Sequence, residues 1–193
     1  MKQKLLHKLN KRHGFSLTEM LATVLIMGFV GIIITTGAAT VQRVYRKVVA
    51  HANAQTALTT TITLMKDQLA FADPESVGNG SETGTGFGNS QTIVFKNLNS
   101  GEQTITLNPG TANRGFTLTY TTGDGTGTNS TSLPLLSDSA ITSDLCVCFD
   151  TDGGFTWDPT TKVITVTNLV AKDTRTDTVQ ARASFKVLLV NDK

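Results

Sequence analysis

The feature that most constrains this chain is an uninterrupted apolar run near its N-terminus. Residues 20–42 contain no formal charge and are rich in leucine, isoleucine, valine, methionine and phenylalanine. About 20 consecutive apolar residues are enough for a helix to span the hydrocarbon core of a bilayer. Because the run is apolar on every side, a helix buried in a soluble core is disfavoured. The sequence therefore predicts a helix that lies in a membrane or in equally dry packing.

Four segments are expected around this run. They are a basic leader at residues 1–14, a hydrophobic transmembrane and assembly helix at 15–42, its amphipathic continuation at 43–72, and a Thr/Gly-rich β head at 73–193. No proline precedes Pro74, so one helix is expected to run from Phe15 to about Ala72.

The amphipathic part carries apolar residues that are mostly three or four positions apart. They are Val41, Val44, Val48, Ala52, Leu58, Ile62, Met65 and Leu69. This spacing places them on one stripe of a helix. We expect that stripe to pack against the head from Val41 onward.

The head is expected to be β-structure, because apolar and polar residues alternate between clusters of turn residues. The predicted strands are 91–97, 102–108, 115–121, 145–150, 162–169 and 178–190, with a hairpin turn at 98–101 and flexible loops at 77–90 and 123–130. In the last strand, Val179 and Phe185 are expected to face the core. Short connections without strand–helix–strand alternation indicate an antiparallel sheet. The predicted fold class is α+β, with one long helix on one face of that sheet.

The junction between leader and helix carries a motif. It reads Lys11-Arg12-His13-Gly14-Phe15-Ser16-Leu17-Thr18-Glu19-Met20-Leu21. A basic leader ends at a glycine, and a phenylalanine then opens an apolar helix whose only charge is a glutamate. With these features in register, residues 1 to about 72 resemble the prepilin family, which comprises type IV pilins and the pseudopilins of type II secretion and competence systems. A long helix followed by a β-rich head agrees with that resemblance.

The resemblance implies a processing pathway. An integral-membrane prepilin peptidase would cut after Gly14 and methylate the new amine of Phe15. Glycine has no side chain, so the extended backbone there can enter a narrow protease cleft. The leader has five cations and no acid, against three cations just beyond the run, Arg43, Arg46 and Lys47. This bias keeps the N-terminus cytoplasmic. We expect a single-pass cell-membrane precursor and a mature subunit in a cell-surface filament.

Glu19 is the candidate assembly residue. A carboxylate at the end of a membrane segment is costly unless it is paired. Once the leader is gone, no basic residue of the same helix lies within a turn of it. The resemblance implies that Glu19 pairs with the amine of Phe15 on a neighbouring subunit. The alternative is a glutamate that marks the membrane boundary and is favoured at a helix N-terminus by the dipole.

Two features of many type IV pilins are missing from the sequence. The stretch that carries a proline in their membrane helix reads Thr35-Thr36-Gly37 here, and no cysteine is placed to close a C-terminal loop. These differences favour a minor pilin or a pseudopilin-like subunit.

Two clusters in the head have open interpretations. Cys146 and Cys148 project from one face of a predicted strand, as buried free thiols, a constrained disulfide or metal ligands, in that order of preference. Asp150, Asp152 and Asp158 surround an Asp-Gly-Gly sequence, which a tight hairpin turn explains. Calcium binding is the alternative, although the spacing departs from the helix–loop–helix calcium pattern.

Catalysis is not expected. The histidines are His7, His13 and His51, so the head has none, which excludes a histidine-based triad or a histidine zinc site within it. A paired-carboxylate hydrolase is the remaining enzyme hypothesis. The sequence predicts no catalytic residue, cofactor, metal ligand or nucleic-acid partner.

The predicted function is a structural subunit, a pilin or pseudopilin of a type IV pilus-like filament. Its expected partners are prepilin peptidase, other pilin subunits, the membrane and, indirectly, an assembly platform protein and ATPase. The alternative is a single-pass surface protein whose head is a binding or adhesion module, or a secreted protein whose signal covers residues 21–39. Adhesion, motility, DNA uptake and secretion all remain open as the purpose of the filament.

Overall fold

The computed structural model describes residues 16–81, 83–97, 103–109, 115–123, 128–136 and 145–190. The elements are α2 (Leu17–Ala70), the 3₁₀-helix η1 (Pro74–Ser76), β1 (Phe87–Ser90), β2 (Ile93–Lys96), β3 (Thr104–Pro109), β4 (Phe116–Gly123), β5 (Thr128–Pro134), β6 (Leu145–Asp158), β7 (Val163–Asp173) and β8 (Thr178–Leu188). The leader, Gly14, Phe15 and the turn at 98–101 lie outside the described residues. The chain divides into two units, Met1–Val48 and Val49–Lys193, and α2 contributes to both.

The long helix predicted from the sequence is confirmed. α2 has 54 residues and continues without a break through Thr35, Thr36 and Gly37. It ends shortly before Asp73, which caps η1 by accepting a hydrogen bond from the Glu75 backbone N–H at 3.4 Å. The proline that follows Asp73 cannot continue an α-helix with its hydrogen bonds intact, so the chain turns here toward the strands.

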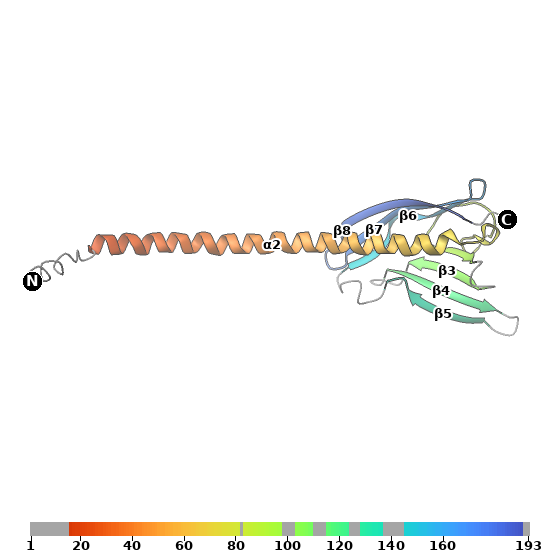
Figure 1. The fold of residues 1–193 in the computed structure, drawn as a ribbon, viewed down its shortest axis with the longest axis horizontal. Helices are drawn as coiled ribbons and strands as arrows, with labels where there is room; N and C mark the ends of the chain where they lie inside the picture. Colours follow the sequence, from red (N-terminus) through yellow and green to blue (C-terminus); the bar gives the residue numbers. More distant parts are fainter. Residues whose placement is uncertain are drawn as a thin grey trace, which may run out of the picture. The chain divides into compact units, whose positions relative to one another are not determined.

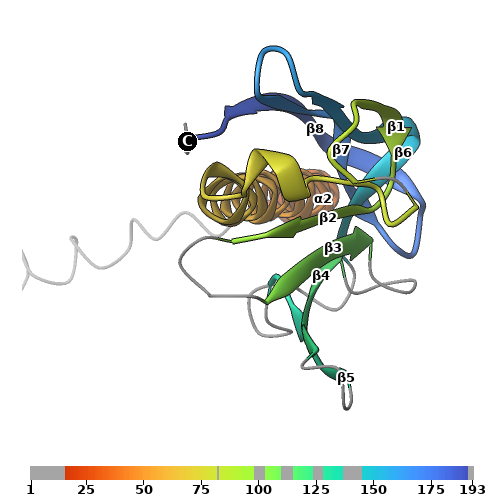
Figure 2. The ribbon, with the colours of Figure 1, turned by 90° about the vertical axis from the view of Figure 1, so that its right-hand side faces the viewer.

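The strands form two four-stranded antiparallel sheets, where the sequence predicted one. Their orders are β2-β3-β4-β5 and β1-β6-β7-β8. The α+β class is confirmed, and within the second unit one sheet lies on each side of the helix (Figures 1 and 2). The division arises because β1, inside the predicted loop 77–90, pairs with β6 and not with β2. The strand β5 was also missed, since its start lies in the predicted loop 123–130.

The helix joins the core of the second unit through a stripe that begins later than expected. Its buried residues are Ala54, Ala57, Leu58, Thr61, Met65 and Leu69. Val41, Val44 and Val48 are exposed, so the prediction that the packed stripe starts at Val41 is wrong. The first buried residues are two alanines, whose small side chains allow the sheets to approach the helix closely. A pattern of large apolar side chains does not include them, so the sequence did not indicate this start.

Three phenylalanines connect the two sheets. Phe116 of β4 meets Phe149 of β6 edge to face, with ring centroids 4.9 Å apart. Phe155 of β6 lies 5.1 Å from Phe149 and 6.4 Å from Phe116, again with near-perpendicular rings. Such pairs contribute about 0.5–1.5 kcal/mol each beyond the burial of their area. This cluster therefore holds the head together as one core.

The Asp-Gly-Gly sequence forms a bulge in β6 and not the hairpin turn that was expected. Phe149 pairs with Leu169, and Gly154 pairs with Thr167, so residues 150–153 are set against Asn168 alone. Asn168 takes a left-handed conformation, with φ of 51°. The prediction failed because β6 continues past the glycines and pairs with β7 on both sides of the bulge.

The last strand, β8, alternates as predicted in its C-terminal half only. Ala181 pairs with Ala171, and Val179 pairs with Lys172, so one residue of β8 is left over between them. This bulge shifts the alternation, and Val179 is 41% exposed, against the expectation that it faces the core. Phe185 is only half-buried and packs against the edge of the core, where the Lys66 ammonium lies 5.4 Å from its ring centroid.

Candidate functional site

The described part of the motif is the first turn of α2. The Ser16 carbonyl accepts hydrogen bonds from the backbone N–H groups of Glu19 at 2.9 Å and Met20 at 3.1 Å, so Ser16 occupies the N-cap position. The Ser16 and Thr18 hydroxyls lie 2.7 Å apart. The spacing Ser-x-x-Glu is typical of a helix start, and this signal in the sequence would have located the cap.

Glu19 lies in that first turn, where the helix dipole favours a negative charge. This position agrees both with Glu19 as an assembly residue and with Glu19 as a residue that marks the membrane boundary. Gly14 and Phe15, the candidate cleavage and methylation residues, fall outside the described residues. The structure therefore places one of the three predicted site residues.

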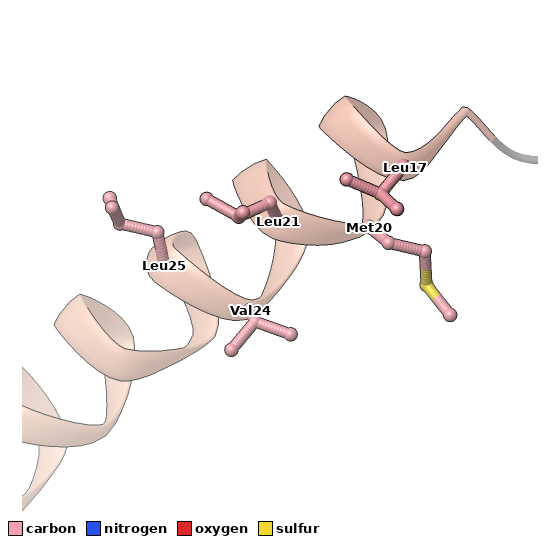
Figure 3. Close-up of a pocket in the computed structure, with 5 residues that line it drawn as sticks. All are labelled: Leu17, Met20, Leu21, Val24 and Leu25. Carbon is pink, nitrogen blue, oxygen red and sulfur yellow. The ribbon is translucent and has the colours of Figure 1, made fainter.

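The apolar part of α2 within the first unit exposes its side chains on all sides. Leu17, Met20, Leu21, Val24 and Leu25 line one apolar surface, at the spacing that brings residues of successive turns together (Figure 3). Leu17 is 80% exposed. Soluble monomers rarely expose so large a continuous apolar surface. By length and composition, this helix is able to cross a membrane.

Threonine hydroxyls within the apolar run are satisfied by the helix itself. Thr23, Thr35 and Thr36 donate to backbone carbonyls one turn earlier, at 2.8, 2.7 and 2.9 Å. Thr40 does the same at 3.0 Å. In lipid every polar group has to be satisfied internally. These hydroxyls therefore bring no unpaired donor to a dry environment.

A comparison with known families identifies the motif at the start of α2. The family model of the prokaryotic N-terminal methylation motif matches residues 9–35. The chain carries the type IV prepilin signature. The match joins the end of the basic leader to most of the apolar run, and it confirms the resemblance drawn from the sequence. No curated protein and no solved structure showed significant similarity.

The prepilin signature belongs to a family of structural pilin-type subunits and not to a family of enzymes. Together with the exposed apolar helix, it is consistent with anchoring in a membrane. The site at the start of α2 thus offers a membrane segment and one carboxylate near its end.

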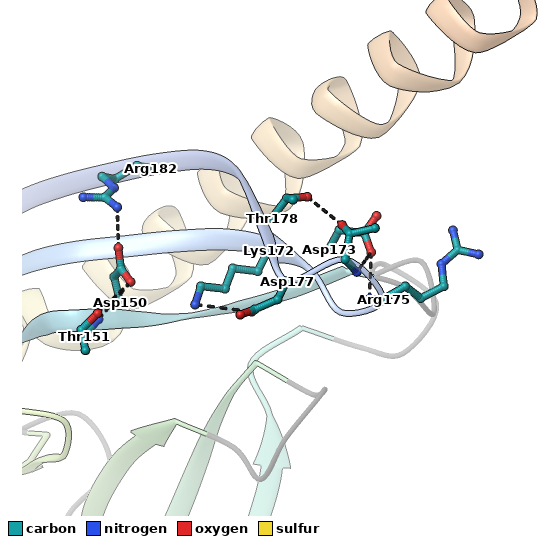
Figure 4. A network of polar contacts seen from close by, with 9 residues as sticks. Asp150, Thr151, Lys172, Asp173, Arg175, Asp177, Thr178 and Arg182 are labelled. Carbon is teal, nitrogen blue, oxygen red and sulfur yellow. Dashed lines mark hydrogen bonds and ion pairs between the residues drawn. The ribbon is translucent and has the colours of Figure 1, made fainter.

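Of the three aspartates considered for calcium binding, Asp150 and Asp158 have separate side-chain partners. The Asp150 carboxylate forms an ion pair with Arg182 (Figure 4), and its pKa is lowered first by a hydrogen bond from the Thr151 backbone N–H and then by Arg182. The Asp158 carboxylate accepts from the Thr161 hydroxyl at 2.7 Å, which lowers its pKa. Among the described residues, no group of three or more His, Cys, Asp or Glu is placed to hold a metal ion.

The ion pair between Asp150 and Arg182 was not anticipated from the sequence. Arg182 of β8 is paired in register with Val170 of β7, while Asp150 belongs to β6. The pair thus bridges two strands across β7, where Val170 is fully buried. The two residues are 32 positions apart in the sequence, and β7 lies between their strands, so no local pattern links them.

Cys146 and Cys148 are free thiols, as preferred from the sequence, but they are half-buried and not buried. They lie on one face of β6, opposite Lys172 and Val170 of β7. A hydrogen bond with Cys146 is the main cause that raises the pKa of Cys148, and burial adds to it. The Cys148 side chain is therefore held as a thiol.

Proposed function

We propose that this chain is the precursor of a subunit of a type IV pilus-like filament. The methylation motif at residues 9–35 carries the proposal, because it continues directly into a helix whose apolar side chains are exposed on all sides. In this proposal residues 1–14 are the leader, and a prepilin peptidase cuts between Gly14 and Phe15. The same enzyme then methylates the amine of Phe15.

Cleavage on the cytoplasmic side leaves the apolar run attached to the mature subunit. The five leader cations keep the N-terminus inside, since cytoplasmic segments retain lysine and arginine. The hydrophobic helix at 15–42 first anchors the subunit in the membrane. It then exchanges lipid for the helices of other subunits, while an assembly platform protein and an ATPase act from outside the filament.

Three glycines support packing of the helix against neighbours. A Cβ at Gly28, Gly31 or Gly37 would meet no atom within 4 Å, so packing within this chain does not require glycine at these positions. Glycine inside a helix costs about 1 kcal/mol relative to alanine. Small residues let helix backbones approach closely in a dry environment, which offsets that cost once neighbours are present.

Glu19 would set the register of assembly. In lipid, or among apolar helices, its carboxylate is costly by about 2.5–3.5 kcal/mol at the centre of the apolar region and by less near its ends. A neighbouring subunit displaced along the filament axis brings its Phe15 amine to this carboxylate and removes the cost. A subunit in the wrong register leaves both charges unpaired.

Substitution of Glu19 tests this role. Glu19→Ala should leave cleavage and membrane insertion intact but reduce the subunit recovered in sheared surface filaments. Glu19→Asp should retain part of the incorporation, because the charge survives while its reach shortens. Glu75→Ala is the matched control, since Glu75 is an exposed glutamate of the head. Equal incorporation of the alanine variant and the wild type would leave Glu19 as a boundary residue.

Within the filament we assign the chain to the minor pilins or pseudopilins. Support comes from the uninterrupted helix at Thr35, Thr36 and Gly37, and from cysteines that lie two residues apart in one strand. Quantitative mass spectrometry of isolated filaments tests the assignment. We expect this subunit to be rare relative to another pilin, and its presence as the most abundant subunit would contradict the assignment.

A further inference from the structure

The edge strands of the two sheets differ in how their outer edges are protected. The edge of β2 is paired, since Gly78 and Val94 exchange backbone hydrogen bonds at 2.8 Å. β1 has only four residues. β8 carries Arg182 and Lys186 and two shifts of register. Pairing, shortness, charges, prolines and bulges are among the devices by which natural sheets avoid adding another strand.

β5 has only one of these devices, Pro134 at its C-terminal end. It comprises seven residues without a charge, and it pairs with β4 in one continuous register. Residues 129–134 are exposed on both faces of the strand. Figure 2 shows β5 as the strand of its sheet farthest from α2. In the described part of the chain, no segment pairs with its outer edge.

The register identifies which backbone groups point outward. The Leu135 N–H donates to the Phe116 carbonyl at 2.8 Å, immediately beyond the ladder of β4 and β5. Hydrogen-bonded pairs alternate along an antiparallel ladder. The N–H groups of Thr128, Ser130 and Ser132 therefore point away from β4. Pro134 falls at the next outward position, where its missing N–H costs the sheet nothing.

We propose that β5 pairs with β5 of a second copy of this chain, antiparallel and centred on Ser130. Unpaired N–H and C=O groups at every second residue are matched by another extended strand. In this register Thr128 faces Ser132 of the second copy, and Ser130 faces Ser130. Every outward N–H from Thr128 to Ser132 is used on both copies, and Pro134 ends the ladder.

Symmetry determines what such a pair would connect. Two identical edges that meet in this way are related by a two-fold axis. Successive subunits of one polar helical filament are related by a rotation with a translation, and not by a two-fold axis. If the proposed function holds, the β5 pair therefore joins heads of two different filaments and bundles them. The pairing itself does not depend on processing or on filament formation.

Cysteine cross-linking of the purified full-length precursor in detergent tests the register. Cys146 and Cys148 are first replaced by serine, and either Ser130→Cys or Ser132→Cys is then introduced. Opposite residues of a hydrogen-bonded pair have Cα atoms about 5.5 Å apart. The two copies of Ser132 would be offset by four residues, or about 13 Å along the strands. Ser132→Cys is thus a matched control on the same exposed edge.

With a bis-maleimide shorter than that offset, we expect several-fold more covalent dimer from Ser130→Cys than from Ser132→Cys. Equal yields, or no dimer from Ser130→Cys, would overturn the proposal. Contacts through α2 would not produce this difference between two positions of one strand.

Amide hydrogen exchange of the same full-length protein provides a second measurement. The amides of Ser130 and Ser132 should become protected as the protein concentration rises, whereas the Thr131 amide, which faces β4, should be protected throughout. Ser130→Lys places two ammonium groups face to face at the axis and should abolish only the concentration-dependent protection. Free exchange of Ser130 and Ser132 at every concentration would contradict the pairing. Because unprocessed protein is used, failure here leaves the proposed function untouched.

Discussion

Gly154→Ala is the substitution that most sharply tests the packing of the β6 bulge. A Cβ at this position would lie 2.2 Å from the Asn89 Oδ1 atom and 2.7 Å from the Ser90 carbonyl oxygen. The Asn89 side chain is able to rotate away, but its Nδ2 atom also donates to the Asp152 carbonyl at 3.2 Å. The Ser90 oxygen belongs to the backbone of β1, so it moves only if the strand moves.

The expected cost follows from these two contacts. Forcing one extra carbon into a well-packed site costs about 1–3 kcal/mol, and loss of the hydrogen bond from Asn89 adds at most about 1 kcal/mol. We therefore expect Gly154→Ala to lower the free energy of unfolding by about 1–4 kcal/mol. The lost stability should come from weaker pairing of β1 with β6.

Urea unfolding of the full chain in detergent measures this cost. Trp157 is the only tryptophan, it is 2% exposed, and it pairs with Phe87 across the same two strands, so its fluorescence reports on this region. Gly88→Ala is the matched control in β1, because a Cβ there would meet no atom within 4 Å. The control should change stability by about 0.5 kcal/mol at most. Unfolding of both variants at the same urea concentration would show that Gly154 is not tightly packed against β1.

Three further predictions concern the head. Phe155→Ala should lower the free energy of unfolding in urea by about 3–5 kcal/mol, because the ring is fully buried. Phe185→Ala should lower it clearly less, because that ring is half-buried, and equal losses would contradict this. Hydrogen bonds lower the pKa of Asp158, so its contribution is present above the ordinary carboxyl pKa of about 3.9 and is lost as the pH falls through the lower folded value. Asp158→Asn should therefore flatten the acid-side loss of stability, and an unchanged pH profile would argue against it. The raised pKa of Cys148 should make alkylation of this thiol slow in the folded protein, as followed by mass spectrometry. Cys146→Ser should make the alkylation faster, and an unchanged rate would show that Cys146 does not raise the pKa of Cys148.

Periodicity and charge predicted those helices and strands that can be recognised from their own residues alone. The apolar run and the absence of proline before Pro74 are local features of one helix, and the alternation in β3, β4 and the C-terminal half of β8 reflects one face of each strand. The alternation persists in the folded chain because each of these strands packs one face against the core. The methylation motif was equally visible, since its parts form one continuous segment, residues 9–35.

What escaped prediction depends on contacts between distant strands. The bulge at residues 150–153 exists because Asn89 and Asn168 approach the β6 glycines closely, and neither neighbour is local in sequence. β1 is too short and too rich in turn residues to be distinguished from a loop. The leftover residue in β8, which turned Val179 outward, also arises from pairing and not from the alternation of β8 itself.

The central claim is tested most directly by mass analysis of the N-terminus of the mature protein from its native membrane. The account predicts a chain that begins at Phe15 and carries one methyl group on its amine. An intact Met1 would instead indicate a membrane-anchored surface protein, and a start near Thr40 would indicate a cleaved secretory signal. Either of these two results would contradict the account.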